Sequence, residues 1–184
     1  MGTPKVGTFI AVHADTFIGE SIQFWEKVQE RRIGKWHDQK LYNHIAGIVT
    51  IDNKLIVGEA LAEGFTLTEF EKSRYFRKEV DFSYFKMYKD FTQYELDALA
   101  GMVLAAKGTP YDFAAIADQV DFATSGIWRG ETGDHAKERL YCSEAWATFV
   151  NNLRKGIFPY PWLVNPQMYI ENPNIIPDSI NLAT

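Results

Sequence analysis

Cysteine is almost absent from this chain, because Cys142 is the only one in 184 residues. A single thiol cannot form an internal disulfide, so the fold does not depend on an oxidising compartment. The sequence also has no H-E-x-x-H motif and no clustered Cys/His spacing of the kind that binds zinc. We therefore expect neither a metal nor a cofactor.

Long hydrophobic runs and phosphate-binding loops are missing as well. No window approaches the roughly 18 apolar residues of a membrane span, and the N-terminal residues lack an apolar run of signal-peptide length. Neither G-x-x-x-x-G-K nor G-x-G-x-x-G occurs. The expected location is the cytoplasm, although a phage protein or a toxin delivered by another route would look the same.

Positive charge is the scarcer sign: 19 Lys and Arg face 24 Asp and Glu, for a net charge of -5. An acidic chain is a poor candidate for binding nucleic acid or anionic membranes. Apolar residues, by contrast, make up 46% of the chain and aromatic residues 15%, which is enough for the core of one domain.

The hydrophobic periodicity predicts both strands and helices. Strands are expected at residues 7–14 and 77–89, with a β-hairpin whose turn is Asp52-Asn53. Helices are expected at residues 20–33, after Thr92, at residues 111–122 and from Cys142 to Leu153. This order has no βα repeat, so it indicates an α+β fold with an antiparallel sheet packed against helices.

The helix after Thr92 carries a capping-box pattern with Glu95. Its expected apolar stripe is Leu96, Leu99, Ala100, Val103 and Leu104. Residues 123–138 are polar and contain glycine, so we interpret them as a loop. Residues 155–184 are rich in proline and aromatic residues, and we expect them to form an extended arm packed on the body made by residues 1–154.

Cys142 has two readings. On a helix it shares a face with Trp146, Phe149 and Leu153, which are core positions, and free cysteine is often buried. A cysteine in the first turn of a helix also lies near unpaired N–H groups and the positive end of the helix dipole, which stabilise a thiolate. Glu144 opposes the thiolate unless its side chain points away. A nucleophile further needs a base.

Hairpin register suggests which base this is. A two-residue turn at Asp52-Asn53 places Ala46 opposite Glu59, and His44 lies two residues from Ala46 on the same face. Glu59 and His44 are then diagonal neighbours, although a slip of one residue would separate them. The alternatives are that His44 and Glu59 form a structural buried ion pair, or that Glu59 lies at a frayed strand end. His135 is a rival base in the expected loop, and His13 and His37 lie elsewhere.

The elements "LYNHIAGIV", "IVGEAL", "YDF" and "LYCSEAW", in this order, resemble the circularly permuted papain-like cysteine hydrolases of the NlpC-type superfamily, the YiiX-like group. The resemblance covers roughly residues 7–150. In the permuted group the histidine lies on an early strand and the cysteine on a late helix, as here. The resemblance implies a hydrolase domain over residues 1–154, with Cys142 as nucleophile, His44 as base and Glu59 as the orienting group.

The same resemblance implies an amidase or peptidase that acts on small peptides or peptidoglycan fragments through a thioester. Tyr111 falls where the family has an aromatic residue near the cleft, and an ordinary core position is the alternative. Residues 123–138 are expected to border the cleft and restrict substrate length. Two other functions stay open: an acyl-ester or thioester hydrolase or acyltransferase acting on lipids, and a non-catalytic binding domain on the same scaffold. The oligomeric state is not predicted.

Overall fold

A computed structural model describes residues 3–13, 41–113 and 139–178 of the protein. The strands are β1 (Phe9–His13), β2 (His44–Ile51), β3 (Lys54–Leu61), β4 (Gly64–Glu69), β5 (Asp81–Met87) and β6 (Ile175–Pro177). The α-helices are α2 (Gln93–Ala106), α4 (Cys142–Leu153) and α5 (Pro166–Ile170), and short 3-10 turns occur at η1 (Phe70–Lys72) and η3 (Pro161–Leu163). The helix expected at residues 20–33 and the loop at residues 123–138 lie outside the described residues.

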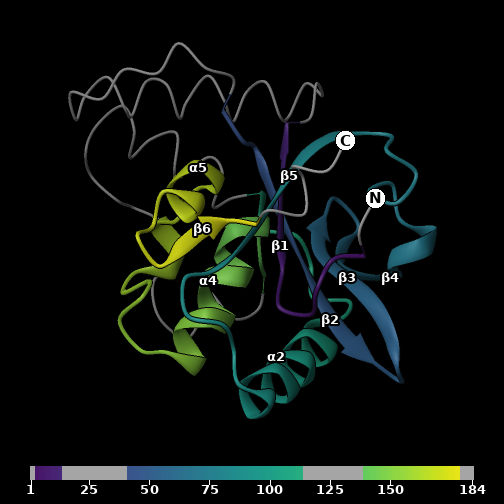
Figure 1. Ribbon diagram of the computed structural model, residues 1–184. Helices are drawn as coiled ribbons and strands as arrows, with labels where there is room; N and C mark the ends of the chain where they lie inside the picture. Colours follow the sequence, from purple (N-terminus) through teal and green to yellow (C-terminus); the bar gives the residue numbers. More distant parts are fainter. Residues whose placement is uncertain (1–2, 14–40, 114–138, 179–184) are drawn as a thin grey trace.

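These strands form one antiparallel sheet in the order β4-β3-β2-β1-β5-β6 (Figure 1). The expected α+β class and the antiparallel sheet are therefore confirmed. The β2–β3 turn is as predicted: Asp52 and Asn53 have φ of 51° and 59°, the left-handed conformation of a two-residue hairpin turn. Strand β5 is shorter than the expected strand, because residues 77–80 belong to the turn before it.

Helices α2 and α4 lie on the same face of the sheet and close the larger hydrophobic core with it (Figure 1). Thr92 and Glu95 form the predicted capping box at the start of α2, with Glu95 N donating to Thr92 Oγ1 and Thr92 N donating to Glu95 Oε2. The predicted stripe was wrong at Leu104, which is 51% exposed, whereas Ala106 is buried. The helix expected at residues 111–122 lies almost wholly outside the described residues.

The opposite face of the sheet carries a second, smaller core. It is closed by Phe70 and Tyr75, which come from the connection between β4 and β5. The side chains of this core are Ile10, Val12, Ala46, Ile48, Val57, Phe70, Tyr75 and Tyr84. The sheet is therefore covered on both faces.

The C-terminal segment is more regular than the extended arm that the sequence predicted. After η3 and α5 it forms β6, which pairs with β5 and becomes an edge strand of the sheet. Phe158 and Tyr169 are buried and stacked, with ring centroids 4.8 Å apart. Burial of these aromatic side chains explains why the proline-rich segment is ordered against the body.

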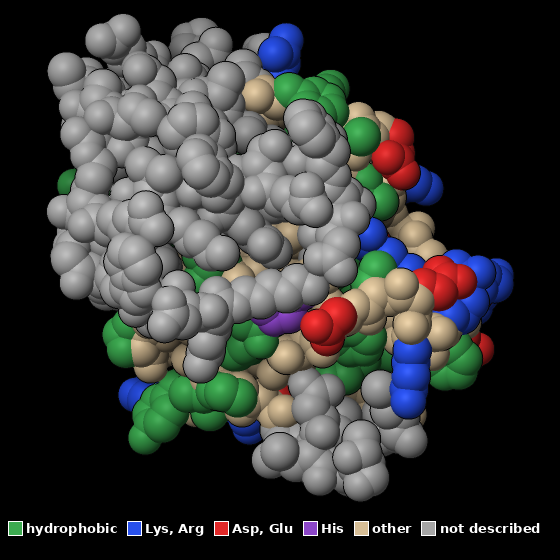
Figure 2. Space-filling view, turned by 90° about the horizontal axis from the view of Figure 1, so that it is seen from above, with side chains coloured by type: hydrophobic (Ala, Val, Ile, Leu, Met, Phe, Trp, Pro, Cys, Tyr) green, Lys and Arg blue, Asp and Glu red, His purple; other side chains and the backbone are tan. Residues whose placement is uncertain are grey.

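Acidic and basic side chains lie beside one another on the described part of the face in Figure 2, with hydrophobic side chains between them. That part of the surface has no patch of one charge sign, such as nucleic-acid-binding proteins present. Within the described residues, no helix is long and apolar enough to cross a membrane.

Candidate active site

Cys142 is the first residue of α4, and only 2% of it is exposed. The first hydrogen bond within the helix runs from Ala145 N to Tyr141 O, at 3.0 Å. The N–H groups of Cys142, Ser143 and Glu144 therefore have no acceptor inside the helix. The thiol lies among these N–H groups and at the positive end of the helix dipole.

Trp146, one turn along α4, positions this helix on the sheet. Its indole lies against Gly47 so closely that a Cβ on Gly47 would be 2.6 Å from the ring. Gly47 is the cross-strand partner of Gly58, whose carbonyl oxygen accepts a hydrogen bond from Trp146 Nε1 at 3.2 Å. Gly47 thus leaves room on β2 for the indole, and the carbonyl oxygen of Gly58 on β3 binds its N–H. These contacts place Cys142 near the start of β2.

The C-terminal segment supports the start of α4 from the other side. Tyr141 Oη donates to the carbonyl oxygen of Trp162 at 2.7 Å, and Ser143 Oγ donates to that of Val164 at 2.6 Å. Both residues flank Cys142. The segment that the sequence predicted to be an arm packed on the body therefore holds the two residues that flank the thiol.

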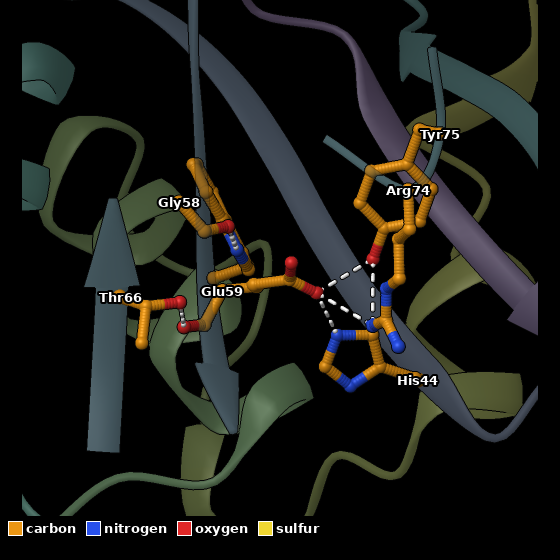
Figure 3. A network of polar contacts seen from close by, with 7 residues as sticks. His44, Gly58, Glu59, Thr66, Arg74 and Tyr75 are labelled. Carbon is orange, nitrogen blue, oxygen red and sulfur yellow. Dashed lines mark hydrogen bonds and ion pairs between the residues drawn. The ribbon is translucent and has the colours of Figure 1, made fainter. Parts of the chain in front are cut away.

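His44 and Glu59 meet as the hairpin register predicted. Ala46 is paired with Glu59, and His44 Nε2 lies 2.8 Å from Glu59 Oε2 (Figure 3). The side chains are 12% and 5% exposed, so the pair is largely removed from water. The contact fixes which ring nitrogen faces the carboxylate, and it leaves Nδ1 available to face Cys142.

The thiol and the imidazole interact directly. Burial opposes ionisation of Cys142, but the charge and hydrogen bond of His44, together with the backbone N–H groups of Ile45 and Ser143, lower the pKa of the thiol. Burial also works against a charged imidazole, yet the charge and hydrogen bond of Cys142, and then the contact with Glu59, raise the pKa of His44 to about 9. Both shifts favour a thiolate–imidazolium pair.

Glu59 has two further partners that were not predicted from the sequence. Its Oε2 also accepts hydrogen bonds from Arg74 Nη2 at 2.7 Å and from Tyr75 Oη at 2.6 Å (Figure 3). Burial alone would raise the pKa of Glu59, but His44, Arg74 and Tyr75 lower it to about 2. The uncharged strand around Glu59 indicated that it needed a cation, but no sequence pattern could choose Arg74 among the basic residues.

Glu144 points inward and is only 3% exposed, so it does not turn away from the thiol. Burial raises the pKa of Glu144 to about 8, against the hydrogen bond from Tyr141 N, and the charges of Asp112 and Cys142 act in the same direction as burial. A carboxyl with this pKa is mostly neutral at pH 7. The expected conflict between Glu144 and the thiolate is therefore relieved by protonation.

Tyr111 lies close enough to Cys142 to sense its charge. Burial first, and then the charges of Cys142 and Asp112, raise the pKa of Tyr111 well above its ordinary value. It forms a bridge with Leu140 and packs against Phe113, whose ring centroid is 4.8 Å away. Tyr111 thus interacts with the charge of Cys142 and is partly buried against the core.

His13 is the other histidine among the described residues. The ring of His13 hydrogen-bonds through Nδ1 to the carbonyl oxygen of Leu41 at 3.0 Å and stacks on Tyr42 at 3.9 Å. The rival base His135, like His37, lies outside the described residues.

The comparisons with known proteins support the fold. A solved structure of the metalloprotein YiiX from Escherichia coli O157:H7, a DUF1105 protein, is similar with a TM-score of 0.64. The similarity covers 95% of this chain and 96% of that one at 16% sequence identity. At this identity the likeness concerns the fold, which is YiiX-like. No protein-family model and no curated protein sequence matches the chain.

The description of YiiX as a metalloprotein raises the question of whether these residues suit a metal. Within residues 3–13, 41–113 and 139–178, no three or more His, Cys, Asp or Glu side chains gather in a way that could hold an ion. His44 and Glu59 are bonded to each other, and Arg74 takes up a position beside the carboxylate where a cation would otherwise bind. The described residues therefore do not fit a metal at this site.

Proposed function

We propose that this protein is a cysteine hydrolase that cleaves an amide bond in a small peptide or a cell-wall peptide. The observation that carries the proposal is the continuous contact from thiol to imidazole to carboxylate, formed by Cys142, His44 and Glu59. A nucleophile, a base and a group that orients the base are the components of thiol hydrolases. The order of His44 before Cys142 in the chain favours the circularly permuted papain-like arrangement.

The proposed reaction forms and then breaks a thioester. The Cys142 thiolate attacks the carbonyl carbon of the amide, and the oxygen that becomes negative accepts hydrogen bonds from N–H groups at the start of α4. The His44 imidazolium gives its proton to the leaving nitrogen, and the C–N bond breaks. His44 then accepts a proton from water, which attacks the thioester, releases the acid and restores the thiolate.

Glu59 would keep the imidazole in one orientation throughout this sequence. Its bond to Nε2 leaves Nδ1 as the atom that exchanges protons with the thiol, the leaving group and water. The carboxylate also stabilises the positive charge on the ring. Tyr111, partly buried beside Cys142, would contact the substrate next to the reacting carbonyl.

The first test is the ionisation of Cys142 as a function of pH. Because it is the only cysteine, the ultraviolet absorbance of the thiolate, corrected with Cys142→Ser, reports this group alone. The same samples are alkylated with iodoacetamide. We expect a thiolate well below the ordinary thiol pKa of about 8.5 in the wild type, and a shift to higher pH in His44→Ala.

His13→Ala is the matched control, because the ring of His13 bonds to the carbonyl oxygen of Leu41 and stacks on Tyr42. A thiolate that appears only above about pH 8.5 in the wild-type protein would contradict the proposal. If the thiol is activated, panels of γ-glutamyl peptides, muropeptides and acyl esters decide the substrate class. Turnover of acyl esters alone would replace the amidase with an esterase that uses the same three residues.

A further inference from the structure

Arg74 and Tyr75 reach Glu59 from a compact turn between β4 and β5. After η1, Ser73 Oγ donates to Phe70 O at 2.6 Å and accepts from Phe76 N at 3.3 Å, and these bonds hold the chain in the turn. Glu79 N donates to Arg74 O at 3.0 Å and closes it. The turn presents two adjacent side chains to a carboxylate that lies 15 and 16 residues earlier in the chain.

Their contacts form a closed group. Arg74 Nη2 donates to Tyr75 Oη at 2.9 Å as well as to Glu59 Oε2, and Tyr75 Oη donates to the same Oε2 (Figure 3). Tyr75 is fully buried. With His44, three donors converge on one carboxylate oxygen, which favours the anion strongly and leaves it little freedom to rotate.

The guanidinium is not placed where its own hydrogen bonding is best satisfied. Arg74 Nε is buried, and the described residues offer it no hydrogen-bond partner. A buried donor without a partner costs free energy, so the pairing with Glu59 must offset that cost. The position of Arg74 is thus explained by the carboxylate that it contacts.

Charge balance points the same way. A Cys142 thiolate, a His44 imidazolium and a Glu59 carboxylate carry a net charge of minus one in a site from which water is largely excluded. The Arg74 guanidinium makes the group neutral. Of the other ionisable groups near the thiol, Glu144 is mostly neutral at pH 7 and Tyr111 stays protonated, while Asp112 adds a negative charge. Without Arg74, the negative charge of Glu59 would be uncompensated and would disfavour ionisation of Cys142.

We propose that Arg74 and Tyr75 are positioning residues of this site, which hold Glu59 as an anion in one orientation so that His44 presents its other nitrogen to Cys142. This inference rests on the proposed function, because it assigns a role in activating the same thiol. Neither residue touches the reacting atoms. They act through Glu59 and His44.

The test compares Tyr75→Phe and Arg74→Gln with the wild type by thiolate absorbance and iodoacetamide labelling across pH. Loss of either donor makes the Glu59 anion less favourable, so Glu59 stabilises the His44 imidazolium less and the thiolate is less favoured. We expect the pH at which half of Cys142 is ionised to rise by about one pH unit. At pH values below this midpoint, the rate of iodoacetamide labelling should then fall about tenfold. Arg74→Lys keeps the charge and should restore part of the wild-type profile.

Two matched controls separate positioning from general packing. Tyr84→Phe removes a hydroxyl from another buried tyrosine in the same smaller core. Arg77→Gln removes an arginine of the same turn whose side chain is 57% exposed and pairs with Glu79. Both controls should keep the wild-type thiolate profile. A shift in Tyr84→Phe equal to that in Tyr75→Phe would overturn the assignment.

A second set of variants tests whether the effect passes through Glu59. When Tyr75→Phe or Arg74→Gln is added to Glu59→Gln, the pH dependence of Cys142 ionisation should stay that of Glu59→Gln alone. An equal shift in the Glu59→Gln background would refute the inference. If the wild-type thiol is activated and the folded Arg74 and Tyr75 variants match it, only this inference fails. If the wild-type thiol is not activated at all, the proposed function fails first.

Discussion

The indole of Trp146 fills the space above Gly47 that any other residue would give to its own Cβ, which would lie 2.6 Å from the ring. This contact joins the helix that carries Cys142 to the strand that begins with His44. The separation of thiol and imidazole therefore depends on a glycine in the middle of a strand. Gly47 is not in a positive-φ conformation, so it is the close approach of the ring that requires glycine.

Gly47→Ala should destabilise the fold and disturb the thiol together. The added methyl group pushes Trp146 and α4 away from the sheet, at a cost of about 1–3 kcal/mol in the free energy of unfolding. Denaturant unfolding measures this cost, and the thiolate curve should move to higher pH as His44 and Cys142 separate. Gly101→Ala is the control, because Gly101 on α2 has open space around it and should gain about 0.5–1 kcal/mol. Equal stabilities for the two variants would contradict this account of α4 docking.

Glu59 should make the protein sensitive to acid. Its pKa is lowered from 4.5 to about 2 in the folded state, so its stabilisation is present above about pH 4.5 and is lost as the pH falls through about 2. We expect the stability difference between the wild type and Glu59→Gln to shrink over this range. Urea unfolding at a series of pH values measures it. All other carboxyl groups are common to both proteins, so a difference that stayed constant with pH would refute the assignment.

Glu144, unlike Glu59, should lower the stability of the protein as the pH rises. Its pKa is raised from 4.5 to about 8, so its favourable contribution is complete below about pH 4.5 and declines as the pH rises toward about 8. The Glu144→Gln variant keeps a neutral side chain of the same shape at every pH. We expect it to become more stable relative to the wild type as the pH rises through this range, with the thiol still activated near neutrality. A gap that does not widen with pH would mean that Glu144 is ionised in the folded protein.

Arg154 should stabilise the packing of α4 against the start of α2. Its Nε and Nη2 atoms donate to the two carboxylate oxygens of Glu95 at 2.7 and 2.9 Å, and Glu95 also belongs to the capping box of α2. Lysine cannot form this paired contact, so Arg154→Lys should cost about 1 kcal/mol or more in thermal or denaturant unfolding. The control Lys86→Gln breaks the pair with Asp90, which is 77% exposed, and should change stability by less than about 0.5 kcal/mol. Similar losses of stability in the two variants would contradict a stabilising role for the paired contact of Arg154 with Glu95.

Local chemistry made part of the site predictable. The Asp52-Asn53 turn sets the pairing of β2 with β3, because two residues of positive φ allow only a tight hairpin, and this pairing brings His44 beside Glu59. The start of α4 at Cys142 followed from the apolar spacing of the residues after it. The catalytic roles of these residues, the expected cytoplasmic location and the nature of the substrate stay predictions.

Other features depend on contacts that no local pattern encodes. Trp146 meets Gly58 across 88 residues, and Tyr141 meets Trp162 across 21. The C-terminal segment was therefore predicted to be an arm, although β6 is part of the sheet. From sequence, Glu144 was expected to oppose the thiolate unless its side chain pointed away. Its actual protonation could not be predicted, because the protonation of a carboxyl depends on burial, which is a property of the assembled core.

The sequence by itself thus determined the α+β class, the hairpin with its register and the helix that begins at the single cysteine, because turns, caps and periodicity act over a few neighbouring residues. Only the tertiary structure decided that the cysteine meets the histidine, that Arg74 and Tyr75 share the carboxylate of Glu59, and that Glu144 is buried. These arrangements arise from packing and charge pairing between distant segments, and their energies exist only once the sheet and its helices have come together.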